Sequence, residues 1–287
     1  MSTVSGAEKL LMNREREIAN KYLFNETWIY VFWGLTNFFV WLSLWPLAIM
    51  NILPLWLILL IACINGCLAY LPSHEAQHGN IIRRSSPYFW INEFVGYVSV
   101  IPLLTGYKFL RETHMLHHKY TNNSDKDPDI GNKSKNFFHA LWICGVMQRQ
   151  PNAGYNLQTD FYQRNISKRA INEHLFFYWF HWIVMISLAW TGYGLVALSV
   201  WWIPRIVGTA YLQITLSWLP HRPMEEQGRY KDTRGWKAMT GTILTQGMEY
   251  HIIHHLYPGI PLHRTPDAFR DMRPILVEKE CVLDGGI

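Results

Sequence analysis

Two long stretches without charge near the N-terminus limit most strongly what this chain can fold into. Residues 28–50 hold no charged side chain for 23 positions, and residues 52–71 hold none for 20. A helix rises about 1.5 Å per residue, so each stretch is long enough to cross a hydrocarbon core of about 30 Å. Only Asn51 separates the two stretches. We therefore expect a tight helical hairpin within a membrane.

A second pair of apolar stretches lies later in the chain. Residues 176–197 are uncharged, and residues 199–219 follow with Pro204 and Arg205 as interruptions. Residues 88–105 are also apolar, but Glu93 and Pro102 predict a segment that enters the membrane without crossing it. Only 16% of the chain is charged, against about 25% in soluble domains. The sequence thus predicts an all-α integral membrane protein with four transmembrane helices in two hairpins and one re-entrant or interfacial segment.

The basic residues are distributed very unevenly. Of 26 Lys and Arg, four lie in segment 1–27, 12 in 72–175 and nine in 220–287, which leaves only Arg205 elsewhere. By the positive-inside rule, both termini and both polar blocks should face the cytoplasm as a histidine-rich cap. We interpret residues 1–287 as one membrane-embedded domain. Its predicted parts are an amphipathic segment 1–27, a hairpin 28–71, cap segments 72–175 and 220–287, and a second hairpin 176–219.

The N-terminal segment leaves two interpretations open. Residues 8–24 mix charged and apolar side chains at helical spacing, which fits either an interfacial amphipathic helix or an ordinary solvated one.

Histidines at helical spacing carry the chemistry of the sequence. Residues three and four apart share one face of a helix, and neutral imidazole is the commonest protein metal ligand. Three clusters have this spacing, and a ninth histidine stands just after the last predicted crossing. The candidate metal ligands are His74, His78, His114, His117, His118, His221, His251, His254 and His255. We interpret the others as packed or interfacial: His139, His174, His181 and His263.

The number of candidate ligands predicts more than one ion. Eight clustered histidines exceed what one ion takes, so two ions with four or five ligands each fit better. Imidazole suits iron, zinc, copper and nickel, so the ligand type leaves the metal open. The four cysteines are scattered, which argues against an iron–sulfur cluster or a zinc ribbon. A net charge of +5 without a basic run argues against nucleic acid as a partner.

The three clusters together resemble the histidine boxes of the membrane fatty-acid desaturase and hydroxylase superfamily. His74–His78 reads as H-x-x-x-H, and His114–His118 and His251–His255 both read as H-x-x-H-H. The resemblance runs from about residue 52 to residue 274. It implies an enzyme with two non-haem iron ions held by histidines and dioxygen as co-substrate. It further implies an external electron donor such as ferredoxin, and His221 matches an additional histidine of many members.

The sequences around the boxes extend the resemblance further. Residues 117–122 with 127–129, and residues 250–261, are similar to the bacterial and cyanobacterial β-carotene hydroxylase branch. The expected function is therefore hydroxylation of a carotenoid ring. The alternative is desaturation of a fatty-acyl lipid, because fatty-acid desaturases have similar sequences beside their histidine boxes. Either substrate is long and apolar and enters from the bilayer. A metal transporter fits less well, because transporters place ionisable ligands within their membrane helices. The only histidine and the only charged residue in the predicted crossings are His181 and Arg205.

Several charged residues have two readings each. Asp127, Asp129 and Glu249 are expected either to orient ligand imidazoles or to be ordinary surface and turn residues. Glu75 lies inside the first box and is expected to face away from the metal. The excess of basic over acidic residues in segment 72–175, 12 against eight, could bind an acidic donor or follow from the positive-inside bias.

Overall fold

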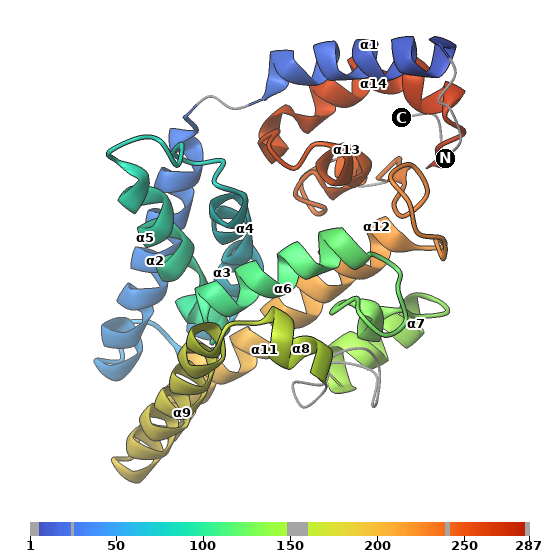
Figure 1. The fold of residues 1–287 in the computed structure, drawn as a ribbon. Helices are drawn as coiled ribbons and strands as arrows, with labels where there is room; N and C mark the ends of the chain where they lie inside the picture. The colour runs from blue at the N-terminus through green and yellow to red at the C-terminus, as the bar shows by residue number, and fades with distance from the viewer. Residues whose placement is uncertain (1–5, 24–25, 148–159, 239–241, 285–287) are drawn as a thin grey trace.

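The computed structural model describes residues 6–23, 26–147, 160–238 and 242–284, and their regular structure is almost entirely helical (Figure 1). The exception is a pair of two-residue parallel strands, β1 (Gly235–Trp236) and β2 (Leu283–Asp284). The α-helices are α1 Gly6–Tyr22, α2 Trp28–Ile49, α3 Leu55–Leu68, α4 Tyr70–His78, α5 Phe89–Val100, α6 Tyr107–Tyr120, α7 Phe137–Ala140, α8 Asp160–Asn165, α9 Lys168–Trp190, α10 Gly194–Ala197, α11 Ile203–Leu212, α12 Leu219–His221, α13 His251–Leu256 and α14 Thr265–Glu278. The 3-10 and π-helical segments are η1 Ile101–Leu103, η2 Ile130–Asn132, η3 Leu141–Met147, η4 Leu198–Trp202, η5 Gln213–Trp218, η6 Met248–Tyr250 and η7 Leu262–Arg264.

Three helical stretches are long and apolar enough to cross a membrane. They are Trp28–Ile49, Leu55–His78 and Gly194–His221. The first two form the expected hairpin, and Asn51 takes a φ of 53° in the turn between them. The second stretch continues as a helix to His78, seven residues beyond the predicted hairpin. The first histidine box therefore extends a membrane helix instead of following it.

The second predicted hairpin differs from expectation. Helix α9 begins with charged residues and ends at Trp190, and Gly192 turns the chain with a φ of 88°. Its uncharged part, residues 174–190, has 17 residues, the lower limit of the range of about 17–25 for a crossing, and α9 is not among the candidate spans of the described residues. A fourth candidate span is instead Phe89–Leu103 with Tyr107–Tyr120, bent by 96°. Such a bend fits a broken span or the re-entrant segment predicted at 88–105, and the two-hairpin arrangement of four crossings stays a prediction.

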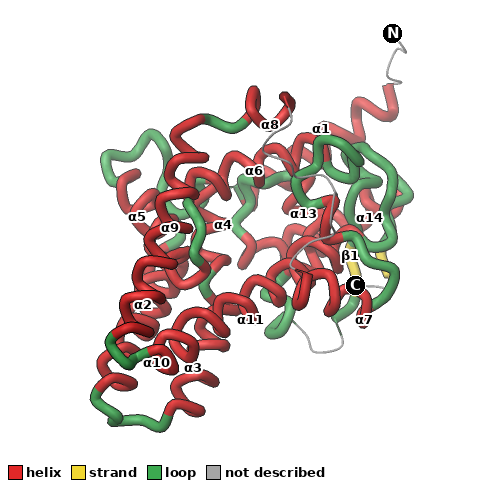
Figure 2. Tube along the Cα trace, turned by 90° about the horizontal axis from the view of Figure 1, so that it is seen from below, coloured by secondary structure: helices red, strands yellow, loops and turns green. Residues whose placement is uncertain are grey.

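Close helix packing fixes the position of α11 against α3. A Cβ atom on Gly208 would lie 2.7 Å from the backbone of Gly66, and one on Gly66 would lie 2.8 Å from the Pro204 carbonyl oxygen. Small residues let two membrane helices approach at backbone distance. Figure 2 shows α2, α3 and α11 side by side in one bundle. This contact holds the helix that ends at His221 against the helix that ends at His78.

The N-terminal helix packs on the polar part of the protein. Helix α1 lies along α14 (Figure 1). Glu15 on α1 is 2% exposed and accepts hydrogen bonds from Arg229, Tyr230 and Tyr257. Helix α1 is thus neither freely solvated nor held by a membrane surface alone. Residue 24, the predicted end of this helix, lies outside the described residues.

An apolar helix lies within the segment predicted to be cytosolic. Residues Phe137–Met147, which are α7 and η3, form a short apolar helix that contacts α11. Phe138 is 79% exposed and Val146 is 62% exposed. Because α11 belongs to a candidate span, this part of segment 72–175 packs beside a membrane helix.

Candidate metal centre

Four helices bring the predicted ligands to one place. The first box lies on α4, the second on α6, the third on α13, and His221 ends α12. These helices gather in the middle of the fold (Figure 1). Helical spacing puts the members of each box on one face, and the packing turns these faces toward one another.

The histidines divide into two sets whose members come from different boxes. In each set, one ligand atom from every residue lies within 4.8 Å of all the others. The first histidine set is His74, His78, His114 and His254, and the second histidine set is His117, His221, His251 and His255.

His118 lies between the two sets, with its Nε2 atom directed at the first and its ring beside the second. Its Nε2 atom is 3.1 Å from Nε2 of His114 and 2.9 Å from Nε2 of His254. Its ring centroid is 4.4 Å from that of His255 in the second set. The structure thus brings all nine predicted ligands together, and their role as ligands stays a proposal.

The nitrogen–nitrogen distances fit metal ligation better than hydrogen bonding. Two nitrogens about 2.1 Å from one ion lie roughly 3.0–3.4 Å apart for angles between 90° and tetrahedral. The Nε2 atoms of His78 and His114 are 2.9 Å apart, and those of His117 and His221 are 3.2 Å apart. A ring nitrogen offers one hydrogen or one lone pair. The His114 nitrogen, with two such neighbours, can therefore bond to only one of them, and a shared cation satisfies all.

The protonation state of the three third-box histidines suits the same role. Burial and the neighbouring imidazoles hold the pKa of His251, His254 and His255 well below its ordinary value. These side chains are therefore neutral near pH 7, and neutral imidazole is the form that binds a metal. The donor set accordingly fits iron or another metal that accepts imidazole.

The comparison with known proteins decides the family. The sequence profile of the fatty acid desaturases, described as "Fatty acid desaturase", matches residues 50–284. The chain belongs to the fatty acid desaturase family. This confirms the predicted superfamily and the prediction of an O2-dependent di-iron oxidoreductase as the class of enzyme.

Individual relatives of this family member are distant and carry desaturase names. An sn-1 oleoyl-lipid 12-desaturase of Picosynechococcus sp. is 21% identical over 79% of the chain and 72% of its own length. A fatty acid conjugase of Calendula officinalis is 24% identical, and an endoplasmic-reticulum omega-3 fatty acid desaturase of Nicotiana tabacum is 21% identical. Each of these two alignments covers 72% of the chain, and the chain spans 64% and 62% of the respective plant proteins. These names favour the desaturase alternative over carotenoid hydroxylation.

Hydrogen bonds from outside the cluster orient the second histidine set. His117 Nδ1 lies 2.8 Å from Oδ1 of Asp127, which is 3% exposed. The Asp127 carboxylate also accepts from the backbone N–H groups of Asn122 and Asp129. His221 Nδ1 donates to the carbonyl oxygen of Asp232 at 3.0 Å. A proton held on Nδ1 leaves Nε2 free for a metal.

The acidic residues near the boxes differ in whether they contact a ligand histidine. Asp127 contacts a ligand histidine, whereas Glu249 accepts a hydrogen bond from Thr245. Glu75 lies beside Nδ1 of His74 at 3.3 Å and accepts from the backbone N–H of Leu262. The sequence analysis missed the Asp232 carbonyl, because a backbone acceptor leaves no signal in the side-chain sequence.

Three further histidines pack against aromatic rings, in agreement with the interpretation of these residues as packed. His174 lies 4.4 Å from the ring of Phe109, and His181 lies 4.6 Å from a ring of Trp201. His263 lies 5.7 Å from the ring of Tyr30.

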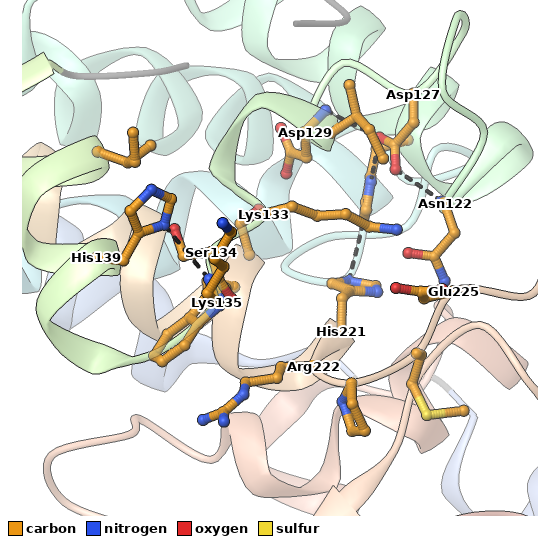
Figure 3. Close-up of a pocket in the computed structure, with 17 residues that line it drawn as sticks. Asn122, Asp127, Asp129, Lys133, Ser134, Lys135, His139, His221, Arg222 and Glu225 are labelled. Carbon is orange, nitrogen blue, oxygen red and sulfur yellow. Dashed lines mark hydrogen bonds and ion pairs between the residues drawn. The ribbon is translucent and has the colours of Figure 1, made fainter.

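Two cavities reach the histidines. The outer cavity, of about 650 Å³, is bounded by the 127–135 segment and the chain after His221 (Figure 3). Asp127, Lys133, His221 and Glu225 are in its wall. The inner cavity, of about 280 Å³, touches members of both sets and extends between the membrane helices. Its apolar wall consists of Tyr70, Leu103, Leu104, Leu110, Leu212 and Leu216.

Arg205 is a charged residue in the wall of the inner cavity. Its guanidinium carbon lies 4.9 Å from the ring centroid of Trp202. The Nε atom is buried and has no hydrogen-bond partner within the part of the chain that the structure describes. Placing an arginine at the centre of a membrane helix costs ~2.5–3.5 kcal/mol, while a cation–π contact returns ~0.5–2 kcal/mol. The contact with Trp202 therefore leaves part of the cost uncompensated.

Proposed function

We propose that this chain is a membrane-bound desaturase that removes two hydrogens from the acyl chain of a lipid with O2 as oxidant. The observation that carries the proposal is the pair of histidine sets beside a cavity whose wall includes a cluster of leucines. The family match and the desaturase and conjugase names of the relatives support the lipid substrate.

The proposed ligands follow the geometry of the two sets. The first histidine set with His118 would hold one iron, and the second histidine set would hold the other. When bound, the iron pair supplies the redox chemistry that breaks an unactivated C–H bond, which side-chain acids and bases cannot do.

The chain's own residues position the reactants. Asp127 and the Asp232 carbonyl keep His117 and His221 turned toward the second iron position. Leu110 and Leu216, in the wall of the inner cavity, provide apolar contact for an alkyl chain. The cavity thus aligns a lipid chain beside both sets and keeps much of it out of water.

We also propose a sidedness for the molecule. The charge distribution, with 25 of 26 Lys and Arg in segments 1–27, 72–175 and 220–287, supports a cytoplasmic location for both termini and the histidines. The chain would act as the single domain 1–287 described above. Electrons would come from a separate donor, such as a ferredoxin, at the cytoplasmic face.

Product analysis tests the function directly. The chain is expressed in cells that contain both acyl lipids and β-carotene, and lipids and pigments are measured by mass spectrometry. We expect acyl chains lighter by two hydrogens, and no such products with His118→Ala. His139→Ala serves as the control, because His139 is not among the nine proposed ligands and its Nδ1 atom accepts a hydrogen bond from the backbone N–H of Lys135. A carotenoid that gains an oxygen atom would show that the reaction is ring hydroxylation and not desaturation. Products that persist in His118→Ala would overturn the proposed site.

A further inference from the structure

The helix that ends at His221 carries a polar side chain at every fourth position. These residues are Arg205, Thr209, Gln213, Ser217 and His221. The first four line the inner cavity, opposite leucines such as Leu103 and Leu110. In a membrane helix, the expected lining for a purely hydrocarbon ligand is apolar throughout. The helix that ends at His221 therefore contributes a row of four polar side chains to the inner cavity, beside its own Leu212 and Leu216.

Arg205 stands at the end of this polar row that is farthest from His221. Sixteen residues separate the two, which corresponds to about 24 Å along the helix. One face of the guanidinium is covered by Trp202, and its buried Nε atom has no hydrogen-bond partner among the described residues. His181 packs against the rings of Trp201 and Trp202, and its two ring nitrogens also have no partner among the described residues. The edge of the guanidinium is left to a group in the cavity.

We propose that the inner cavity binds a lipid with an oxygen acceptor on its apolar chain, and that Arg205 binds this acceptor. A guanidinium pairs with a carboxylate through two parallel hydrogen bonds and also donates to hydroxyl or carbonyl oxygens. The fixed distance between Arg205 and the histidines then determines how far the chain enters. Arg205 is a positioning residue. The part of this inference that concerns which carbon reacts rests on the proposed function. The binding of the lipid by Arg205 does not depend on it.

Equilibrium binding to nanodiscs that contain the full chain tests the proposal. The probes are radiolabelled hexadecanoic acid, hexadecan-1-ol and hexadecane, and empty nanodiscs give the background. With Arg205→Met we expect the affinity for the acid to fall about tenfold or more, the ratio that loss of one charge-assisted hydrogen bond produces. Hexadecane binding should stay unchanged. An equal loss for the alcohol identifies a neutral oxygen as sufficient, whereas a loss for the acid alone identifies a carboxylate.

Two further variants keep the test decisive. Arg205→Lys keeps the charge without the planar fork, so acid binding should fall to an intermediate value even if Arg205→Met does not fold. Arg270→Met removes an exposed arginine on α14 and should change nothing. If Arg205→Lys and every folded Arg205 variant bind all three probes like the unaltered chain, the proposal is wrong.

Product analysis separates this inference from the proposed function. Arg205→Lys should shift the position of the new double bond while the histidines stay intact. Arg205-dependent binding without any desaturated product would leave the inference standing and refute the proposed reaction. Desaturated products together with unchanged binding in the Arg205 variants would support the proposed reaction and refute the inference about Arg205.

Discussion

The two histidine sets are similar in composition and differ in what holds them. Each set has a histidine at the end of a candidate membrane span, His78 in the first and His221 in the second, and the outer contact of the first set is Glu75, which neighbours His74 in sequence. The second set is tied to loops, through Asp127 in the turn after α6 and the Asp232 carbonyl after α12. Glu75 lies on the same helix as His74, whereas Asp127 and Asp232 lie in loops outside the helices that carry the second set. We therefore expect the two sets to respond differently to mutations outside the ligands.

Removing a ligand should have the largest effect in both sets. His74→Ala, His118→Ala or His255→Ala should reduce product formation below detection, because each would remove a ligand from an iron site. Expression should fall little, since the helices around the cluster stay packed. Iron content per chain, measured on purified protein, should drop by about half for His255→Ala, with only the second site emptied. Normal turnover in any of the three variants would show that the ligand set is wrong.

Asp127→Asn should have the next largest effect. Loss of the carboxylate leaves His117 without its orienting partner, and such changes cost about 10–100-fold in activity or metal affinity. Competition with a chelator should show weaker binding of one iron per chain and an unchanged second iron. Asp125→Asn is the matched control, since Asp125 is exposed in the same turn. Equal weakening of both irons would contradict the separation into two independently held sets.

Glu75→Gln should affect activity less than Asp127→Asn. The contact between Glu75 and His74 is 3.3 Å, against 2.8 Å for Asp127 and His117, and the helix already fixes His74. We expect a loss below about tenfold. The melting temperature should fall as well, because Glu75 also accepts hydrogen bonds from Asn80 and Leu262. A greater loss of activity than in Asp127→Asn would reverse the comparison.

A charge reversal at the rim of the outer cavity should have the smallest effect. Lys135 is exposed beside this cavity, which reaches the second set. If an acidic donor docks there, Lys135→Glu should slow reduction several-fold at low salt and weaken its salt dependence. Lys9→Glu is the control, since Lys9 is exposed on α1. Identical stopped-flow rates for the two variants would place the docking surface elsewhere.

Local pattern was enough to predict much of the candidate site. Helical spacing depends on residues three and four apart, so the sequence alone indicated which face of each box carries its histidines. The uncharged runs in 28–71 likewise predicted the first hairpin, because a membrane helix satisfies its backbone polar groups internally. The second hairpin was predicted less well. The turn at Gly192 divides the apolar run at 176–197, and the helix before this turn begins with charged residues.

The sequence by itself determined the long uncharged runs that are typical of a membrane protein and the helical spacing that suits nine histidines to metal binding. Only the tertiary structure decided their partition, in which His117 belongs to the second set and the Nε2 atom of the neighbouring His118 contacts the first. It also decided that Asp232 contributes its carbonyl and that Arg205 faces the cavity. The physical reason is that periodicity fixes the direction of a side chain relative to its own helix. Which group it meets depends on packing between segments separated by up to about 180 residues, such as His74 and His254.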